Sequence, residues 1–325
     1  MITKVLFNKV AQIPELPGFS VVSQHVSGDG DALVLYVESQ ALEIVTAMME
    51  AENGVVFPLV SMPEPAAFRL SILSPSDQKT VELPELDTTF PYFDIFPDGR
   101  VVVAGSRSYW RANDDFGLNG IIIDPVTGER ERFLPGDGIQ RLAVDARGRI
   151  WVSYFDEGIL GNNGYGDGGT PPVGTLGLNR FNGCGDLVWV FTDAEELESG
   201  PIIDCYALNV SDDQAALYAD TYDGYVLYRI SANDETELFK SDLQGCQHFA
   251  IDDSQILFTG QIDDDYDIGY FGRLSSGGVS EIQDIKFLLP GGSKLYDGQF
   301  VGRGDTLHFF DESNWYSTSI DALFS

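Results

Sequence analysis

The sequence predicts an all-β fold made of repeated antiparallel sheets. Apolar runs of about five to eight residues, rich in Val, Ile, Tyr, Phe and Trp, alternate with turns containing Gly, Asp, Asn and Pro along the 325 residues. A unit of strand, tight polar turn, second strand and acidic loop recurs along the chain. Helical periodicity is confined to residues 39–52, which we expect to form about three turns of helix.

The repeat unit occurs six times, and its copies are residues 21–37, 93–106, 142–156, 206–220, 249–263 and 299–311. A third and a fourth short apolar strand follow most copies; the third strands are GIIID, GLNRF, YVLYRIS and YFGRLS, and the fourth are ERERFL, DLVWVF, ETELF and VSEIQ. Four-stranded antiparallel sheets repeated radially form a β-propeller, whose blades pack face to face and bury both faces of their strands. We therefore expect a six-bladed β-propeller that occupies residues 1–325 as one domain.

The two ends of the chain are expected to share one blade. After the apolar strand 314–320 only five residues remain, too few for a fourth strand. The N-terminal run 2–10 precedes the first repeat and has no partner of its own. Pairing this run with the last blade would remove an open sheet edge, so we expect the N-terminal strand to close the ring.

Two repeats resemble those of a known group of proteins. The segments DARGRIWVSYFDEG (145–158) and FPDGRVVVAGS (96–106) are similar to the repeat of six-bladed propellers of the NHL, streptogramin-lyase and SMP-30/gluconolactonase kind. The resemblance implies the fold. Streptogramin-type lyases would further imply a set of His and carboxylate residues, and SMP-30-type enzymes a cluster of carboxylate and Asn metal ligands. His25, His248 and His308 lie in different repeats and match no lyase motif, so the function does not transfer with the fold.

The charge excludes several classes of function. Lys and Arg total 19 against 51 Asp and Glu, which gives a net charge of −32 and repels nucleic acid and anionic membranes. No 18 apolar residues run together, and the N-terminal segment lacks a signal-peptide pattern, so we expect a cytoplasmic protein. Cys184, Cys205 and Cys246 have no metal-ligand spacing and are expected to remain unpaired in a reducing compartment.

Acidic side chains follow the second strand of four consecutive repeats. The predicted metal-ligating residues among them are Asp156, Glu157, Asp220, Asp223, Asp263, Asp265 and Asp267. In a propeller these loops lie on one face, and flexible carboxylate loops are the ligands that Ca²⁺ prefers. Three interpretations stay open: a solvated acidic surface, a Ca²⁺ site, or a surface that binds a basic protein.

Two long loops and the first strands supply the other candidates. Residues 106–119 place Arg107, Tyr109, Trp110 and Arg111 together, and such residues anchor partners or stack on sugars, although an aromatic side chain can also fill the gap between blades. The glycine-rich stretch 157–174 is expected to form a lid over one face. Arg141 lies near the start of a first strand and is a further candidate ligand-binding residue.

His248 and Asp94 also lie near the starts of first strands. They would act as general base and orienting acid if they met across the channel, although a His bonded to backbone carbonyls is the commoner arrangement. The charge favours a binding scaffold for a basic protein, because a negative potential speeds encounter with basic surfaces. A Ca²⁺-dependent hydrolase or lyase is the first alternative, and a glycan-binding propeller is the second.

Overall fold

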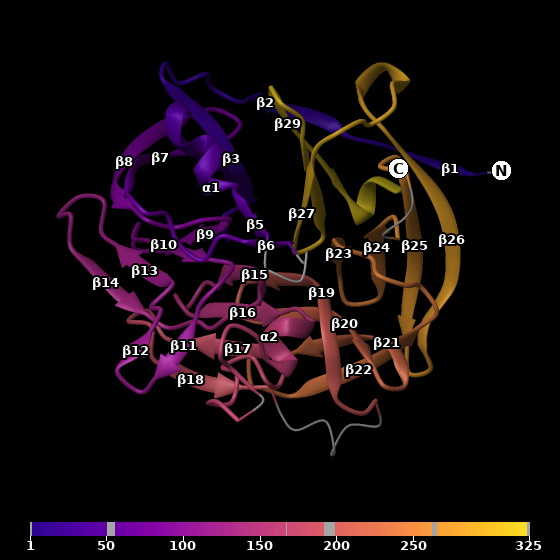
Figure 1. Ribbon diagram of the computed structural model, residues 1–325. Helices are drawn as coiled ribbons and strands as arrows, with labels where there is room; N and C mark the ends of the chain where they lie inside the picture. The colour runs from indigo at the N-terminus through magenta and orange to yellow at the C-terminus, as the bar shows by residue number, and fades with distance from the viewer. Residues whose placement is uncertain (1, 51–55, 167, 192–198, 262–264, 324–325) are drawn as a thin grey trace.

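The computed structural model describes residues 2–50, 56–166, 168–191, 199–261 and 265–323, and within these ranges the chain forms a six-bladed β-propeller (Figure 1). Each blade is built on four antiparallel strands, and the sheet of blade five gains a fifth, parallel strand from the N-terminal segment. The first strands of the blades contact one another around a central channel, and the later strands follow toward the rim. This arrangement confirms the predicted fold.

The first three blades take their strands in chain order. Blade one contains β3 (Phe19–Val26), β4 (Ala32–Glu38), β7 (Ala66–Leu73) and β8 (Gln78–Leu86). Blade two contains β9 (Pro91–Ile95), β10 (Val101–Gly105), β13 (Gly120–Ile123) and β14 (Arg130–Phe133). Blade three contains β15 (Ile139–Val144), β16 (Ile150–Tyr154), β17 (Leu178–Phe181) and β18 (Leu187–Val190).

The last three blades complete the ring. Blade four contains β19 (Ile202–Ser211), β20 (Gln214–Thr221), β21 (Gly224–Ile230) and β22 (Thr236–Ser241). Blade five contains β23 (Phe249–Ile251), β24 (Gln255–Thr259), β25 (Ile268–Ser275) and β26 (Gly278–Leu288). Blade six contains β27 (Gln299–Arg303), β28 (Thr306–Phe310), β29 (Asn314–Ser319) and, from the N-terminal segment, β2 (Asn8–Gln12).

The N-terminal segment serves two blades rather than one. β2 pairs antiparallel with β29 and closes the ring as predicted. β1 (Thr3–Leu6) instead pairs in parallel with β26, at the outer edge of blade five. Between these strands, Phe7 is buried and lies 5.5 Å from Phe287, ring centre to ring centre. The segment therefore covers two sheet edges that would otherwise be open.

The predicted helix over residues 39–52 is wrong for part of its described length, and its last two residues, 51 and 52, lie outside the described residues. One turn of 3₁₀ helix, η1 (Ser39–Ala41), leads into α1 (Leu42–Val45). The chain then forms β5 (Met48–Glu50), which pairs antiparallel with β6 (Val56–Pro58). The remaining short elements of the described chain are β11 (Trp110–Ala112), β12 (Asp115–Phe116), α2 (Asp156–Leu160), η3 (Pro290–Gly292) and η4 (Ile320–Leu323).

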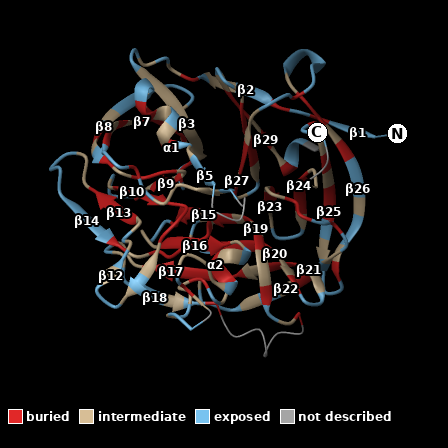
Figure 2. Cartoon of the chain, viewed as in Figure 1, coloured by how far each residue is buried: buried red, intermediate tan, exposed pale blue. Residues whose placement is uncertain are grey.

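The core lies between the blades. Every residue of β10 and β16 is buried, whereas β14 on the rim exposes three of its four residues (Figure 2). In the turn before β16, Asp145 accepts hydrogen bonds of 3.0 Å from the backbone N–H groups of Arg147 and Arg149. Its second oxygen accepts a 2.9 Å bond from the indole N–H of Trp151. Gly148 supplies the positive φ of 71° that this turn requires. The motif that carries the family resemblance is therefore explained by packing and turn geometry.

The loops define two faces. We call the face that carries the second-to-third-strand loops the loop face. The described residues of its loops are 39–50, 56–65, 106–119, 155–166, 168–177, 222–223, 260–261, 265–267 and 311–313. We call the opposite face, with the turns between first and second strands, the turn face. Cys184 is exposed, and Cys205 and Cys246 are buried. Among the described residues, no helix is long and apolar enough to cross a membrane.

Candidate functional site

The six first strands enclose a pocket of about 290 Å³ in the channel. Its polar lining comprises Gln24, His25, Tyr92, Arg141, His248 and Gln299, and Phe93 and Phe300 add aromatic walls. His248, Gln299 and Phe300 also line an adjoining hollow of about 340 Å³, which includes Tyr266 of the loop face. A ligand could therefore enter the channel pocket from that face.

Asp94 lies beside this pocket on β9 and is fully buried. Its carboxylate accepts hydrogen bonds from the backbone N–H groups of Ile95 (2.8 Å) and Val144 (2.7 Å). Arg303 lies 3.4 Å and His25 3.5 Å from the same carboxylate. Burial alone would raise the pKa of Asp94. The charges of Arg303 and His25, together with the hydrogen bonds from His25 and from the N–H of Val144, outweigh burial and hold the pKa below its ordinary value. Asp94 is thus a charged group that connects blades within the structure.

His248 occupies another part of the channel, and no described hydrogen bond or ion pair joins it to Asp94. Its Nε2 atom lies 3.4 Å from a terminal nitrogen of Arg141. Burial lowers the pKa of His248 well below its ordinary value, and the charges of Arg141 and His25 lower it further. His248 is therefore neutral, and a general base would require a pKa nearer to the working pH. The predicted pairing with Asp94 stays a hypothesis that no contact supports.

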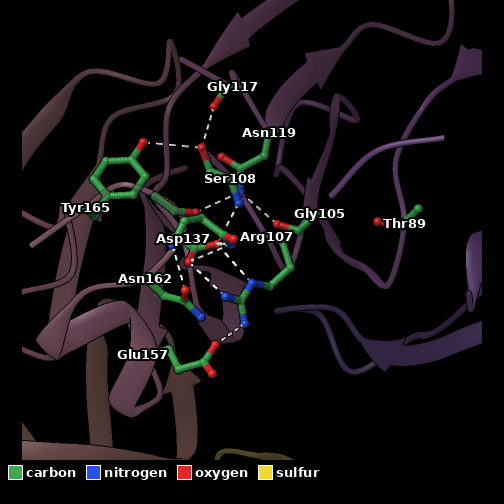
Figure 3. A network of polar contacts seen from close by, with 12 residues as sticks. Thr89, Gly105, Arg107, Ser108, Gly117, Asn119, Asp137, Glu157, Asn162 and Tyr165 are labelled. Atoms are coloured by element: carbon green, nitrogen blue, oxygen red, sulfur yellow. Dashed lines mark hydrogen bonds and ion pairs between the residues drawn. The ribbon is translucent and has the colours of Figure 1, made fainter. Parts of the chain in front are cut away.

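Arg107 is part of a buried polar network (Figure 3), and it also lines a pocket of about 300 Å³ together with Tyr109. Its guanidinium donates two hydrogen bonds of 3.0 Å to the two carboxylate oxygens of Asp137 and forms a further ion pair with Glu157. Asn163 donates to both oxygens of Asp137 at 3.2 Å, and the Ser108 N–H donates at 2.7 Å. The network joins blade two to blade three at the loop face.

The other three candidates of that loop lie at the surface. Arg111 is exposed, its guanidinium lies 4.4 Å from the ring centre of Tyr109, and its only described ion pair is a 3.5 Å contact with Asp115. Trp110 is half-buried, and its N–H donates to the carbonyl of Asn163 at 3.0 Å. The side chains of Tyr109 and Arg111 therefore remain accessible, while the backbone at Trp110 holds the neighbouring loop.

The stretch predicted as a lid is packed against blade two. Its start forms α2, and Asn163 contacts both Asp137 and Trp110. A Cβ atom at Gly164 would lie 1.8 Å from the carbonyl oxygen of Trp110, and its φ is 94°, so only glycine fits there. These contacts join the stretch to the loop at 106–119.

The acidic residues that were predicted to bind one metal ion have different partners in different parts of the structure. Glu157 pairs with Arg107, and buried Asp267 pairs with Lys286 at 2.9 Å and with Lys294 at 3.6 Å. Asp223 and Asp265 are exposed turn residues, and Asp263 lies outside the described residues. In the part of the chain that the structure describes, no group of three or more His, Cys, Asp or Glu is placed to hold a metal ion. The calcium site stays a prediction.

Two of the predicted residues, Asp156 and Asp220, both interact with a third carboxylate, Asp204, which was not predicted from the sequence. Asp204, half-buried near the start of β19, interacts with both of them. Its pKa is raised to about 6, chiefly by burial, and then by the negative charges of Asp156 and Asp220. The N–H of Asp156 and the hydroxyl of Tyr206 bond its carboxylate and only partly offset this effect. We call Asp156, Asp204 and Asp220 the carboxylate triplet.

Of the comparisons with known proteins, the one with solved structures alone found similar chains. No protein-family model and no curated protein matches the chain. Solved structures similar to it include a virginiamycin B lyase from Staphylococcus aureus, at TM-score 0.45 and 14% identity over 97% of this chain and 100% of that one. A gluconolactonase from Xanthomonas campestris has TM-score 0.43 and 10% identity over 95% and 100%. The propeller domain of a trilobed protease from Pyrococcus furiosus has TM-score 0.45 and 13% identity over 94% and 83%.

At these identities and TM-scores the likenesses carry no argument, and the protein is classed as a six-bladed β-propeller on its own strand pairing. The site must be argued from its own residues. Sequence reasoning missed His25, Asp137, Asp204 and Arg303. Asp204 could have been predicted from its position in the sequence. It lies near the start of an innermost strand, and a carboxylate there faces the channel mouth that the acidic loops also line. No local sequence pattern predicts His25, Asp137 or Arg303, because their partners come from other blades.

Proposed function

We propose that the protein is a binding scaffold whose loop face takes a basic surface of a protein partner at the carboxylate triplet. The observation that carries the proposal is the position of Asp204, a half-buried carboxylate that lies beside Asp220 on the paired strand and has no ion pair among the described residues. In the free protein its negative charge is costly, since it lies in a poorly solvated position beside Asp156 and Asp220. A Lys or Arg side chain from a partner would relieve that cost.

The surroundings of the triplet favour an organic cation over a metal ion. Tyr206 and Tyr225 lie next to each other, with ring centres 5.7 Å apart, and Tyr222 at the end of β20 is 75% exposed. Aromatic faces attract ammonium and guanidinium groups, and Tyr is enriched at the centres of protein interfaces. The three carboxylates do not form a metal-binding group. Guanidinium and ammonium groups on a partner surface can be spaced to meet separate carboxylates.

The net charge of −32 supports the same proposal through kinetics. A strong negative potential raises the association rate of a basic partner, while specific pairs decide where the partner docks. Long-range attraction by the net charge acts over the whole surface. An experiment must therefore distinguish this attraction from binding at the carboxylate triplet.

The test uses an octalysine peptide as a cationic probe and isothermal titration calorimetry at about 0.15 M salt, where long-range attraction is screened beyond about 8 Å. The variant Asp204→Asn/Asp220→Asn removes two charges from the triplet. The matched control, Asp29→Asn/Asp253→Asn, removes two exposed charges from the turn face and changes the net charge equally. We expect the triplet variant to weaken binding about tenfold, or about 1.4 kcal/mol, and the control less than twofold. Equal weakening by both variants would reduce the attraction to net charge and refute the proposed site.

A further inference from the structure

Arg141, in the channel, lacks among the described residues the carboxylate partner that most arginines of this protein have. Of the thirteen arginines in the sequence, eleven form an ion pair with an Asp or Glu. The two without one among the described residues are Arg130, which is exposed on β14, and Arg141, which is half-buried on β15. Acidic residues outnumber basic ones by 51 to 19, so an inward arginine without a carboxylate needs a reason.

The hydrogen bonds of Arg141 leave its guanidinium incompletely satisfied. One terminal nitrogen donates to the carbonyl of Gln140 at 2.7 Å. The other is 3.4 Å from both the carbonyl of Gln247 and the Nε2 atom of His248, at the long limit for a hydrogen bond. The Nε atom is buried and has no partner among the described residues. A buried donor without a partner is costly, so this guanidinium has free capacity for a ligand.

Neighbouring groups in the channel do not neutralise Arg141. His248 is neutral, because burial and the charge of Arg141 lower its pKa. Asp94, the buried carboxylate beside the pocket, already interacts with Arg303, His25 and two backbone N–H groups. The described channel therefore carries an uncompensated positive charge inside a strongly acidic protein. At physiological salt the repulsion from distant surface carboxylates is screened, and the local charge determines what the pocket binds.

The shape of the pocket indicates the class of ligand. A volume of about 290 Å³ suits a small molecule, and Phe93, Phe300 and Tyr92 provide aromatic walls beside Arg141. A single guanidinium matches the charge and planar geometry of one carboxylate, to which it can donate two parallel hydrogen bonds. A phosphate dianion would call for a second cation. Neutral His248 does not provide it, and His25, the other histidine of the pocket, is already paired with Asp94 at 3.5 Å.

We propose that the channel pocket binds a small carboxylate with a flat apolar body, and that Arg141 receives its carboxylate group. This site is separate from the carboxylate triplet, has the opposite charge preference, and does not depend on the proposed partner surface.

The test titrates benzoate, its neutral isostere benzamide and inorganic phosphate into the full-length protein by calorimetry. We expect saturable benzoate binding, at least tenfold weaker binding of benzamide, and weaker binding of phosphate. Arg141→Met should weaken benzoate binding at least tenfold, and Arg141→Lys, which keeps the charge but not the planar donor pair, should weaken it less. Arg130→Met, the matched control at the other unpaired arginine, should leave it unchanged.

Three results would overturn the inference: benzamide binding as tightly as benzoate, full benzoate affinity in a folded Arg141→Met variant, or no saturation by benzoate up to about 10 mM. Tighter binding of phosphate would overturn the assignment to carboxylates. If Arg141→Met does not fold, the inference is still tested by comparing the binding of benzoate and benzamide to the unaltered protein. Loss of octalysine binding at the triplet would leave all these outcomes unaffected.

Discussion

Replacing Asp204 by Asn should make the protein more stable at neutral pH, although the replaced side chain makes hydrogen bonds. The pKa of Asp204 is raised from 3.8 to about 6 by burial and by Asp156 and Asp220. Between these two pH values the folded protein keeps a proton that the unfolded chain has released. The free energy of unfolding therefore falls as the pH rises from about 4 to 6, and it stays lower above pH 6.

The size of the effect follows from that pKa difference. At 1.36 kcal/mol for each pH unit between the folded and unfolded pKa, a difference of about two gives an upper limit of about 3 kcal/mol. Asp204 is only half-buried, and solvent screening reduces the effect to about 1–2 kcal/mol. Asparagine keeps the side-chain oxygen that can accept from Tyr206 or the N–H of Asp156, and it removes the charge.

The assay is denaturation by urea at pH 4, 5, 6 and 7.5, which compares the free energies of unfolding of the two proteins. We expect Asp204→Asn to match the unaltered protein within about 0.5 kcal/mol at pH 4 and to exceed it by about 1–2 kcal/mol at pH 7.5. Asp223→Asn, an exposed acidic residue of the same face, should change stability by less than about 0.5 kcal/mol throughout. Lower stability of Asp204→Asn at pH 7.5, or a difference that does not vary with pH, would refute the reasoning.

Three further outcomes test the fold and its contacts. Arg107→Met leaves two carboxylates without their buried guanidinium and should cost about 3–5 kcal/mol in urea denaturation, whereas exposed Arg111→Met should cost less than about 0.5 kcal/mol. Deleting residues 2–12 removes both N-terminal strands and should lower the melting temperature by roughly 5–10 °C, more than twice the effect of deleting residues 2–6; equal effects would contradict closure by β2. A thiol reagent should modify Cys184 quickly in the folded protein and the two buried cysteines only after unfolding; fast reaction of all three would contradict their burial.

The propeller could be predicted because its signals are local. The turn at Asp145 bonds to its own neighbours within six residues, and Gly148 is needed for the backbone geometry, so the pattern repeats wherever the turn repeats. Closure by an N-terminal strand followed from counting the strands of the last blade. The helix prediction was wrong for residues 48–50 because Met48–Glu50 pair as a strand with Val56–Pro58, a tertiary contact that overrides the helical spacing of the apolar residues.

The site depends on contacts that no local pattern contains. Arg107 reaches Glu157 across 50 positions, and Arg303 reaches Asp94 across 209. Which arginine pairs with which carboxylate depends on the distances between blades, and these are absent from composition and spacing. For the same reason the acidic loops cannot be distinguished by their sequences. Asp267 forms ion pairs with two lysines, whereas Asp156 and Asp220 raise the pKa of Asp204.

The most direct test of the proposed function is to locate a bound cation on the protein. Hydrogen–deuterium exchange with mass spectrometry can compare the protein with and without octalysine at about 0.15 M salt. The proposal predicts slower exchange on the loop face at 202–206 and 220–225, and unchanged exchange on the turn face at 252–254 and 304–306. Equal protection on both faces, or protection confined to the turn face, would contradict a binding site at the carboxylate triplet.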